Sequence, residues 1–468
     1  MDCVLLIFVK LPGGSIAGGH DKSELSSMGW KMKQISINYK MSNSGLSDVC
    51  QADYTQRLEP EIARIRMGRS NYDTPYAFLH TPWDLQAQQH VLQLAEQKSA
   101  LCPVALFVIG IGGSSWGSQA VLHALYGIAY NDTNPQLRVY FVDTIDSDYV
   151  HNMLSIAQSH LQLGEHVIVN IVSKSGATIE IIANMSLFIQ LLEQYEKDRA
   201  YQYVVVTTGQ HSSLWEYALQ MKFATLVIPT MVGGRYSVFS CAGLFPLALA
   251  GIAIEQLCAG GAYMAQQCGI AGGDGNMAAY CAAVLVNQYA MGKQVHDTFL
   301  FSADFESIGQ WYRQLLAESI GKRFDNDGNE VNVGMLPTVS VGPRDLHSVA
   351  QLYLAGPNNF FTTFVTVNNA LDELQIPPGK NLSVDQIVGR TLSEVSQAIA
   401  YATMDAYATY DRAYLLLEVP EKSAYCIGQL LMSKMIETVY VGYLLEVNPF
   451  DQPEVELYKT KTKNLLAR

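Results

Sequence analysis

The sequence predicts an α/β protein made of two tandem, doubly wound α/β/α domains followed by a C-terminal helical tail. From residue 104 onward, short β-rich runs alternate with helix-length segments, a pattern typical of parallel sheets covered by helices. The alternation stops over 240–290, which is largely helical and carries a glycine-rich break at 269–275, and then resumes. We therefore expect the boundary between the two domains near this break.

Each expected strand is a short apolar run bounded by turn residues. The first sheet is expected from runs at 104–109, 137–142, 166–172, 203–207 and 225–228. The second is expected from runs at 295–301, 335–341, 361–367 and 414–418, with helices at 304–320 and 423–445. A last helix is expected at 454–466, after the loop Asn448–Pro453.

These elements divide the chain into four expected parts. Residues 1–41 have weak periodicity and form either a disordered extension or the product of a mis-assigned start codon. The first domain, with a preceding helical segment, covers 42–270, the second covers 271–447, and the tail helix lies within 448–468.

Composition excludes several classes of protein. The 468 residues include 43 acidic and 30 basic side chains, a net charge of −13, so neither nucleic acid nor an anionic membrane is an expected partner. No apolar run reaches about eighteen residues and no basic segment precedes the apolar N-terminus, so neither a membrane span nor a signal peptide is expected.

The cysteine and histidine patterns point to a cytoplasmic protein without a metal site. The eight cysteines contain no C-x-x-C pair and lie mostly in apolar segments, as expected for inert thiols in a reducing compartment. The ten histidines contain no H-x-x-x-H pair and no His/Cys cluster, so no metal is expected.

The turn Ser173-Lys174-Ser175-Gly176-Ala177-Thr178 follows an apolar run and precedes a helix-like segment. A helix start offers unpaired backbone N–H groups and the positive end of the helix dipole, and short hydroxyl side chains add hydrogen-bond donors. The turn therefore predicts a binding site for a phosphate monoester, a site we call the phosphate seat, and a small phosphorylated molecule as the substrate.

A second glycine-rich turn, Gly110–Gly117, follows the run 104–109. It could belong to a dinucleotide-binding or a nucleoside-triphosphate-binding motif, but it lacks a residue that each motif requires. A dinucleotide fingerprint needs glycine where the chain has Ser115, and a nucleoside-triphosphate loop needs lysine where it has Ser118. Neither NAD nor ATP is therefore expected, and no cofactor is predicted. Two serine-bearing turns after two parallel strands fit one phosphate that they hold jointly.

Four residues are candidates for the chemistry. Glu318 shares a helix face with Gln310 and Gln314 beside a core-facing Leu315-Leu316 pair, where a partly desolvated carboxylate can serve as a general base. A solvated helix carboxylate is the alternative. Arg235 follows two glycines and is suited to stabilise an enediolate or a phosphate, although a surface charge would look the same.

His347 follows the expected strand 335–341, at a sheet edge where α/β proteins usually build their sites, but a helix-capping histidine fits equally well. Lys459 lies on the last helix among other lysines, where a solvated face is the simpler explanation.

Together these segments resemble the glucose-6-phosphate isomerase (phosphoglucose isomerase) family, from about residue 70 to the C-terminus. The agreement comes from six blocks in order: Gly110–Gly117, Ser173–Glu180, Gly233–Ser237, Gln310–Lys322, Asp345–Gln351, and Asn448–Pro453 with Val455, Glu456 and Lys459. Glu454 departs from the pattern, because the family usually has glycine there.

The resemblance implies two sugar-isomerase (SIS) domains and a cofactor-free, reversible conversion of glucose 6-phosphate to fructose 6-phosphate. It implies that Glu318 moves a proton between C2 and C1 through a cis-enediolate, that Arg235 stabilises the intermediate, and that His347 and Lys459 open the sugar ring. Family members are typically homodimers, so His347 is expected to act in the neighbouring subunit. The implied binding residues are Gly113, Ser114, Ser173, Lys174, Ser175 and Thr178 for the phosphate, and Gln314 and Gln452 for the sugar.

Two alternatives remain open from the sequence. A related enzyme acting on another hexose or amino-sugar phosphate would share the fold and the phosphate seat. A noncatalytic phosphosugar-binding regulator would keep the serine turns without needing Glu318, His347 and Arg235 together.

Overall fold

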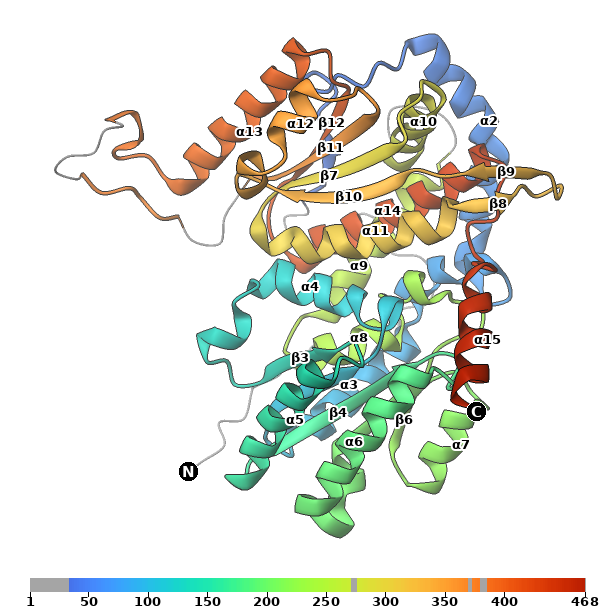
Figure 1. The fold of residues 1–468 in the computed structure, drawn as a ribbon, viewed down its shortest axis with the longest axis vertical. Helices are drawn as coiled ribbons and strands as arrows, with labels where there is room; N and C mark the ends of the chain where they lie inside the picture. The colour runs from blue at the N-terminus through green and yellow to red at the C-terminus, as the bar shows by residue number, and fades with distance from the viewer. Residues whose placement is uncertain (1–32, 271–275, 369–372, 379–384, 468) are drawn as a thin grey trace, which may run out of the picture.

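The computed structural model describes residues 33–270, 276–368, 373–378 and 385–467. Two α/β units lie one above the other, each with its own five-stranded sheet (Figure 1). Each of the nine strands expected from the sequence is present, with bounds within one residue of those expected. The predicted class, two doubly wound α/β units with a helical tail, is confirmed.

The first sheet is entirely parallel, and its strands lie in the order β3-β2-β4-β5-β6. Because helices cover both faces, the strands are continuous apolar runs, and the last four residues of β2 are fully buried. The strands are β2 (Pro103–Ile109), β3 (Arg138–Val142), β4 (His166–Ser173), β5 (Val204–Thr208) and β6 (Ala224–Val227). Strands β2 and β4 are adjacent, and Ile109 at the end of β2 lies opposite Ile171, two residues before the end of β4.

Helices α5 and α6 cover the face of this sheet toward the viewer in Figure 1, and α3 and α8 lie behind it. Helix α4 follows β2 and packs against α11 of the other unit, so it joins the two halves. The helices of this unit are α3 (Leu85–Ser99), α4 (Trp116–Tyr126), α5 (Ser147–Gln162), α6 (Ile179–Glu196), α7 (Ser213–Gln220) and α8 (Cys241–Leu249).

The second sheet has the order β1-β12-β11-β7-β10, parallel except for β1. Its strands are β7 (Val295–Phe301), β10 (Leu336–Val341), β11 (Phe360–Val367), β12 (Tyr414–Val419) and β1 (Ser36–Ile37). Strand β1 lies within the expected 1–41 segment and joins the sheet, because Ser36 and Ile37 pair with Glu418 and Leu417. Residues 1–32 lie outside the described part.

Helices α12 (Ala350–Ala355) and α13 (Leu392–Thr409) lie above the second sheet in Figure 1, and α11 (Glu306–Ile320) and α14 (Ala424–Leu444) lie below it. Helix α14 packs along α9 (Ile254–Cys268), α10 (Met277–Ala290) and α2 (Asp48–Met67). Between α11 and β10, the chain forms a hairpin of β8 (Lys322–Phe324) and β9 (Glu330–Val333), which the sequence pattern did not predict. Of the glycine-rich break expected at 269–275, residues 271–275 lie outside the described residues.

The tail helix α15 (Val455–Leu466) contains no buried residue and descends beside the first unit in Figure 1. Across the described ranges, no helix combines the length and apolar character that a membrane crossing requires. Six of the described cysteines are free thiols: Cys50, Cys241, Cys258, Cys268, Cys281 and Cys426.

Candidate active site

Arg235 is the centre of a polar network between the two units. It lies in a short turn, Gly234–Tyr236, and is only 4% exposed. A guanidinium has five N–H donors, and each meets an acceptor here. The acceptors are Ser319 Oγ at 2.7 Å, Gln452 Oε1 at 2.6 Å, Glu318 Oε2 at 3.3 Å, and the carbonyl oxygens of Pro449 at 2.6 Å and Asp451 at 3.1 Å.

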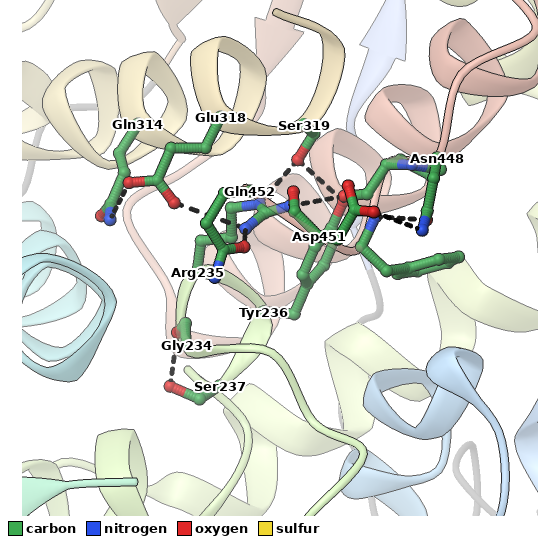
Figure 2. A network of polar contacts seen from close by, with 12 residues as sticks. Gly234, Arg235, Tyr236, Ser237, Gln314, Glu318, Ser319, Asn448, Asp451 and Gln452 are labelled. Atoms are coloured by element: carbon green, nitrogen blue, oxygen red, sulfur yellow. Dashed lines mark hydrogen bonds and ion pairs between the residues drawn. The ribbon is translucent and has the colours of Figure 1, made fainter. Parts of the chain in front are cut away.

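Glu318 extends from the last turn of α11 toward Arg235 (Figure 2). The preceding Leu315 and Leu316 are fully buried, as the sequence predicted, and this fixes the helix face that carries the carboxylate. One carboxylate oxygen accepts from Gln314 Nε2 at 3.1 Å and the other faces Arg235. The side chain is 35% exposed, so the carboxylate is held on one side and accessible on the other.

Lys322 and Asp451 close the network behind Glu318. Lys322 is 6% exposed, and its ammonium donates to the Glu318 carbonyl oxygen at 3.0 Å and to Asp451 Oδ1 at 2.9 Å. Burial lowers the pKa of Lys322, and the neighbouring Asp451 opposes that shift. Neither residue was given a role from the sequence, because Lys322 lies beyond the end of α11 and its contact with Asp451 joins distant segments of the chain.

The glycine-rich turn after β2 lies directly against the Arg235 turn. A Cβ on Gly113 would come within 2.2 Å of the Gly234 carbonyl carbon, and one on Gly112 within 2.8 Å of Gln314 Nε2. Ser237 Oγ also donates to the Gly113 carbonyl oxygen at 3.2 Å. Only glycine permits this approach, which brings the first sheet's turn, the arginine and helix α11 together.

The two hydroxyl-bearing turns leave adjacent strands of the first sheet. Ser114 follows β2, while Ser173 ends β4 and begins the turn before α6. Thr178 Oγ1 lies 3.2 Å from Ser173 Oγ and 3.4 Å from Ser175 Oγ, so three hydroxyls gather at the start of an 18-residue helix. Burial lowers the pKa of the neighbouring Lys174.

His347 is not part of this cluster within one chain. It is exposed in the turn after β10, and the nearby Arg344 pairs with Glu306 at 3.0 Å. Glu306 begins α11 and Glu318 lies near its end, so about 18 Å of helix separates them at about 1.5 Å per residue. The structure therefore places His347 at one end of α11 and Glu318 at the other.

Lys459 also lies apart from the cluster. Its side chain on α15 is 44% exposed, and its ammonium pairs with Glu456 at 2.6 Å. In the described residues, no three His, Cys, Asp or Glu side chains gather as metal ligands would. Of the four proposed chemical residues, the single chain thus brings together Arg235 and Glu318 only.

Comparison with known proteins gives this geometry a class and a family. A carboxylate–arginine pair between two doubly wound units, with hydroxyl groups at the carboxyl ends of β2 and β4, is consistent with the class of α/β phosphosugar isomerases. The family model "Phosphoglucose isomerase" matches residues 103–468. The chain belongs to the phosphoglucose isomerase family.

Individual relatives agree with this assignment. The glucose-6-phosphate isomerase of Carboxydothermus hydrogenoformans is 33% identical over 77% of this chain and 78% of its own length. That of Leptospira biflexa is 30% identical over 92% of this chain and 96% of its own. The crystal structure of a Thermus thermophilus protein described as hypothetical superposes with a TM-score of 0.84 at 28% identity, covering 93% of this chain and 100% of its own.

Proposed function

We propose that this chain interconverts glucose 6-phosphate and fructose 6-phosphate, with Glu318 as the acid/base group. The observation that carries the proposal is the partly exposed Glu318 carboxylate, held between Gln314 and the buried Arg235 in a member of this family. Isomerisation between neighbouring carbons requires a carboxylate that reaches both, and general acid/base catalysis of this kind contributes about 10²–10⁴ in rate.

The phosphate group would sit at the carboxyl ends of β2 and β4. Hydroxyls there donate hydrogen bonds, and unpaired backbone N–H groups at the turns and the α6 dipole favour the negative charge. The proposed contacts are the side chains of Ser114, Ser173, Ser175 and Thr178 and the backbone N–H groups of Gly113 and Lys174.

The reacting carbons would lie above Glu318. The carboxylate takes the proton from C2, leaving a cis-enediolate, and returns it to C1, while the hydroxyl proton of O2 passes to O1. Arg235 supports the developing negative charge, but its five N–H donors already have protein acceptors, so it acts through its buried positive charge rather than through a free N–H. The Gln314 Oε1 atom is buried without a hydrogen-bond partner in the described part of the chain, so a sugar hydroxyl that reached it would satisfy it. Gln452 would contact the sugar from the other side of Glu318, where its Oε1 atom accepts from Arg235.

Ring opening would use His347 and Lys459. Because about 18 Å of α11 separates Glu318 from the end beside His347, we assign this histidine to the site of a second copy of the chain, which implies a homodimer. Lys459 would reach the ring oxygen only when α15 lies over a site. The scheme moves protons alone, so it needs neither cofactor nor metal, and free thiols are consistent with a cytoplasmic location.

The test is the coupled assay of fructose 6-phosphate conversion with a Glu318→Gln variant. We expect kcat to fall by about 10²–10⁴, with phosphate affinity retained, because the amide keeps the shape but cannot accept the proton. Glu193→Gln, an exposed carboxylate on α6, is the matched control and should keep wild-type kcat. A Glu318→Gln protein that keeps most of its kcat would remove Glu318 as the base.

A further inference from the structure

The two sheets share one topology. If strands are numbered by their order along each sheet unit, both sheets read 2-1-3-4: β3-β2-β4-β5 in the first and β10-β7-β11-β12 in the second. Ligands of such sheets bind where the order reverses, between the carboxyl ends of strands 1 and 3. In the first sheet this point lies between β2 and β4, at the two hydroxyl turns. In the second it lies between β7 and β11.

A cleft of about 260 Å³ occupies this point of the second sheet. The ends of β7 and β11 form its floor, with Thr366 opposite Phe301 in the sheet, and the first turns of α13 form one wall. Its polar lining consists mainly of hydroxyl and amide side chains: Ser302, Thr366, Asn368, Thr391, Ser393 and Gln397.

Thr366 gives the cleft a specific feature. Its side chain is 5% exposed, and its Oγ1 atom has no hydrogen-bond partner in the described part of the chain. A buried hydroxyl without a partner is costly, and a ligand in the cleft would satisfy it. The unpaired Thr366 hydroxyl is a second observation, independent of the strand order, and it indicates a binding site at the same place between β7 and β11.

The charges of the lining distinguish this cleft from the phosphate seat. Its one cation among the described lining residues, Lys422, is paired with Asp304 at 2.5 Å. Two carboxylates, Glu373 and Glu394, also line it, and Glu394 caps α13 by accepting from the Thr391 backbone N–H at 2.7 Å. An anion would meet net negative charge here, whereas hydroxyl and amide groups both donate to and accept from a neutral polyol.

We propose that the cleft between the carboxyl ends of β7 and β11 is a second binding site of this chain, and that it takes an uncharged polyhydroxylated molecule, a free sugar or sugar alcohol. The site is separate from the Glu318 network, and the proposal does not depend on the isomerase mechanism.

The experiment is ligand-observed NMR of sorbitol with the full chain. Saturation transfer to sorbitol is expected with wild type, and Thr366→Val should weaken sorbitol binding at least about fivefold, because it removes one hydrogen bond without changing the shape. Thr362→Val is the matched control: Thr362 is a buried threonine of the same strand and the same sheet face, outside the cleft, and its variant should bind sorbitol normally.

Competition identifies the site and the ligand class. The sorbitol signal should persist in excess inorganic phosphate and in excess fructose 6-phosphate. Displacement by phosphate would mean an anion site, displacement by fructose 6-phosphate alone would mean binding at the first sheet, and either result overturns the proposal, as does the absence of saturation transfer. If Thr366→Val does not fold, Ser393→Ala replaces it, and unchanged sorbitol binding by that variant overturns the proposal too.

Discussion

The carboxyl edges of the two sheets have the same strand order but different surroundings. At the first edge, the turn after β2 lies against the Arg235 turn, and hydroxyl groups gather at the start of α6. At the second edge, the corresponding point is a hydroxyl- and amide-lined cleft with two carboxylates, and His347 follows the neighbouring strand β10. Strand order thus fixes where a site forms, and the loops and their charges decide what it holds.

The largest expected effect tests whether His347, at the carboxyl edge of the second sheet, acts in the active site of another subunit. Glu318→Gln and His347→Gln proteins should each be nearly inactive, but mixing them after dissociation should restore activity. About a quarter of wild-type activity is expected, because half of the pairs are mixed and each mixed pair has one intact site of two. The coupled assay before and after mixing measures this.

Mixtures that stay inactive, while native mass spectrometry shows mixed pairs, would mean that His347 acts in its own chain or not at all. Mixing two preparations of the Glu318→Gln variant is the control and should restore nothing.

The second-largest effect is expected at the contact between the turns of Gly113 and Gly234, at the carboxyl edge of the first sheet. Gly113→Ala should lower kcat/KM more than tenfold and destabilise the fold by about 1–3 kcal/mol, because the new Cβ would collide with the Gly234 backbone. Gly234→Ala is the matched control on the other side of the contact, since a Cβ there meets nothing within 4 Å. Kinetics and thermal unfolding of both variants decide the point, and equal losses in the two would contradict the packing argument.

The smallest expected effect tests whether Ser175 belongs to the proposed phosphate-binding site of the first sheet. Ser175→Ala should raise KM for fructose 6-phosphate about tenfold with little change in kcat, because one hydrogen bond to a charged group is lost. Ser186→Ala, which removes an exposed hydroxyl further along α6, should leave KM unchanged. Steady-state kinetics measures both, and a Ser175→Ala enzyme with wild-type KM would remove Ser175 from the phosphate seat.

The sequence was most informative where local pattern determines structure. Apolar runs located the strands to within one residue, and the i, i+4 spacing placed Gln314 beside Glu318. Both follow from periodicity within a few residues of chain.

Features that depend on distant segments were not predictable in this way. Strand β1 pairs with β12 more than 300 residues later, and the contact of Gly113 with Gly234 joins two turns with no shared pattern. The burial of Lys322 depends on the loop at Asp451, and the separation of His347 from Glu318 depends on the direction of α11. The domain boundaries and the roles of the site residues remain predictions.

The acceptors of Arg235 also set the order in which the site can be assembled. Three of its five hydrogen-bond acceptors come from residues 449–452, close to the end of the chain. During synthesis the first α/β unit can fold early. The arginine beside Glu318, however, has its full set of partners only after almost the whole polypeptide has been made. A chain that ends before this segment would therefore contain both sheets and the Glu318 carboxylate, but its Arg235 would lack three of its five hydrogen-bond acceptors.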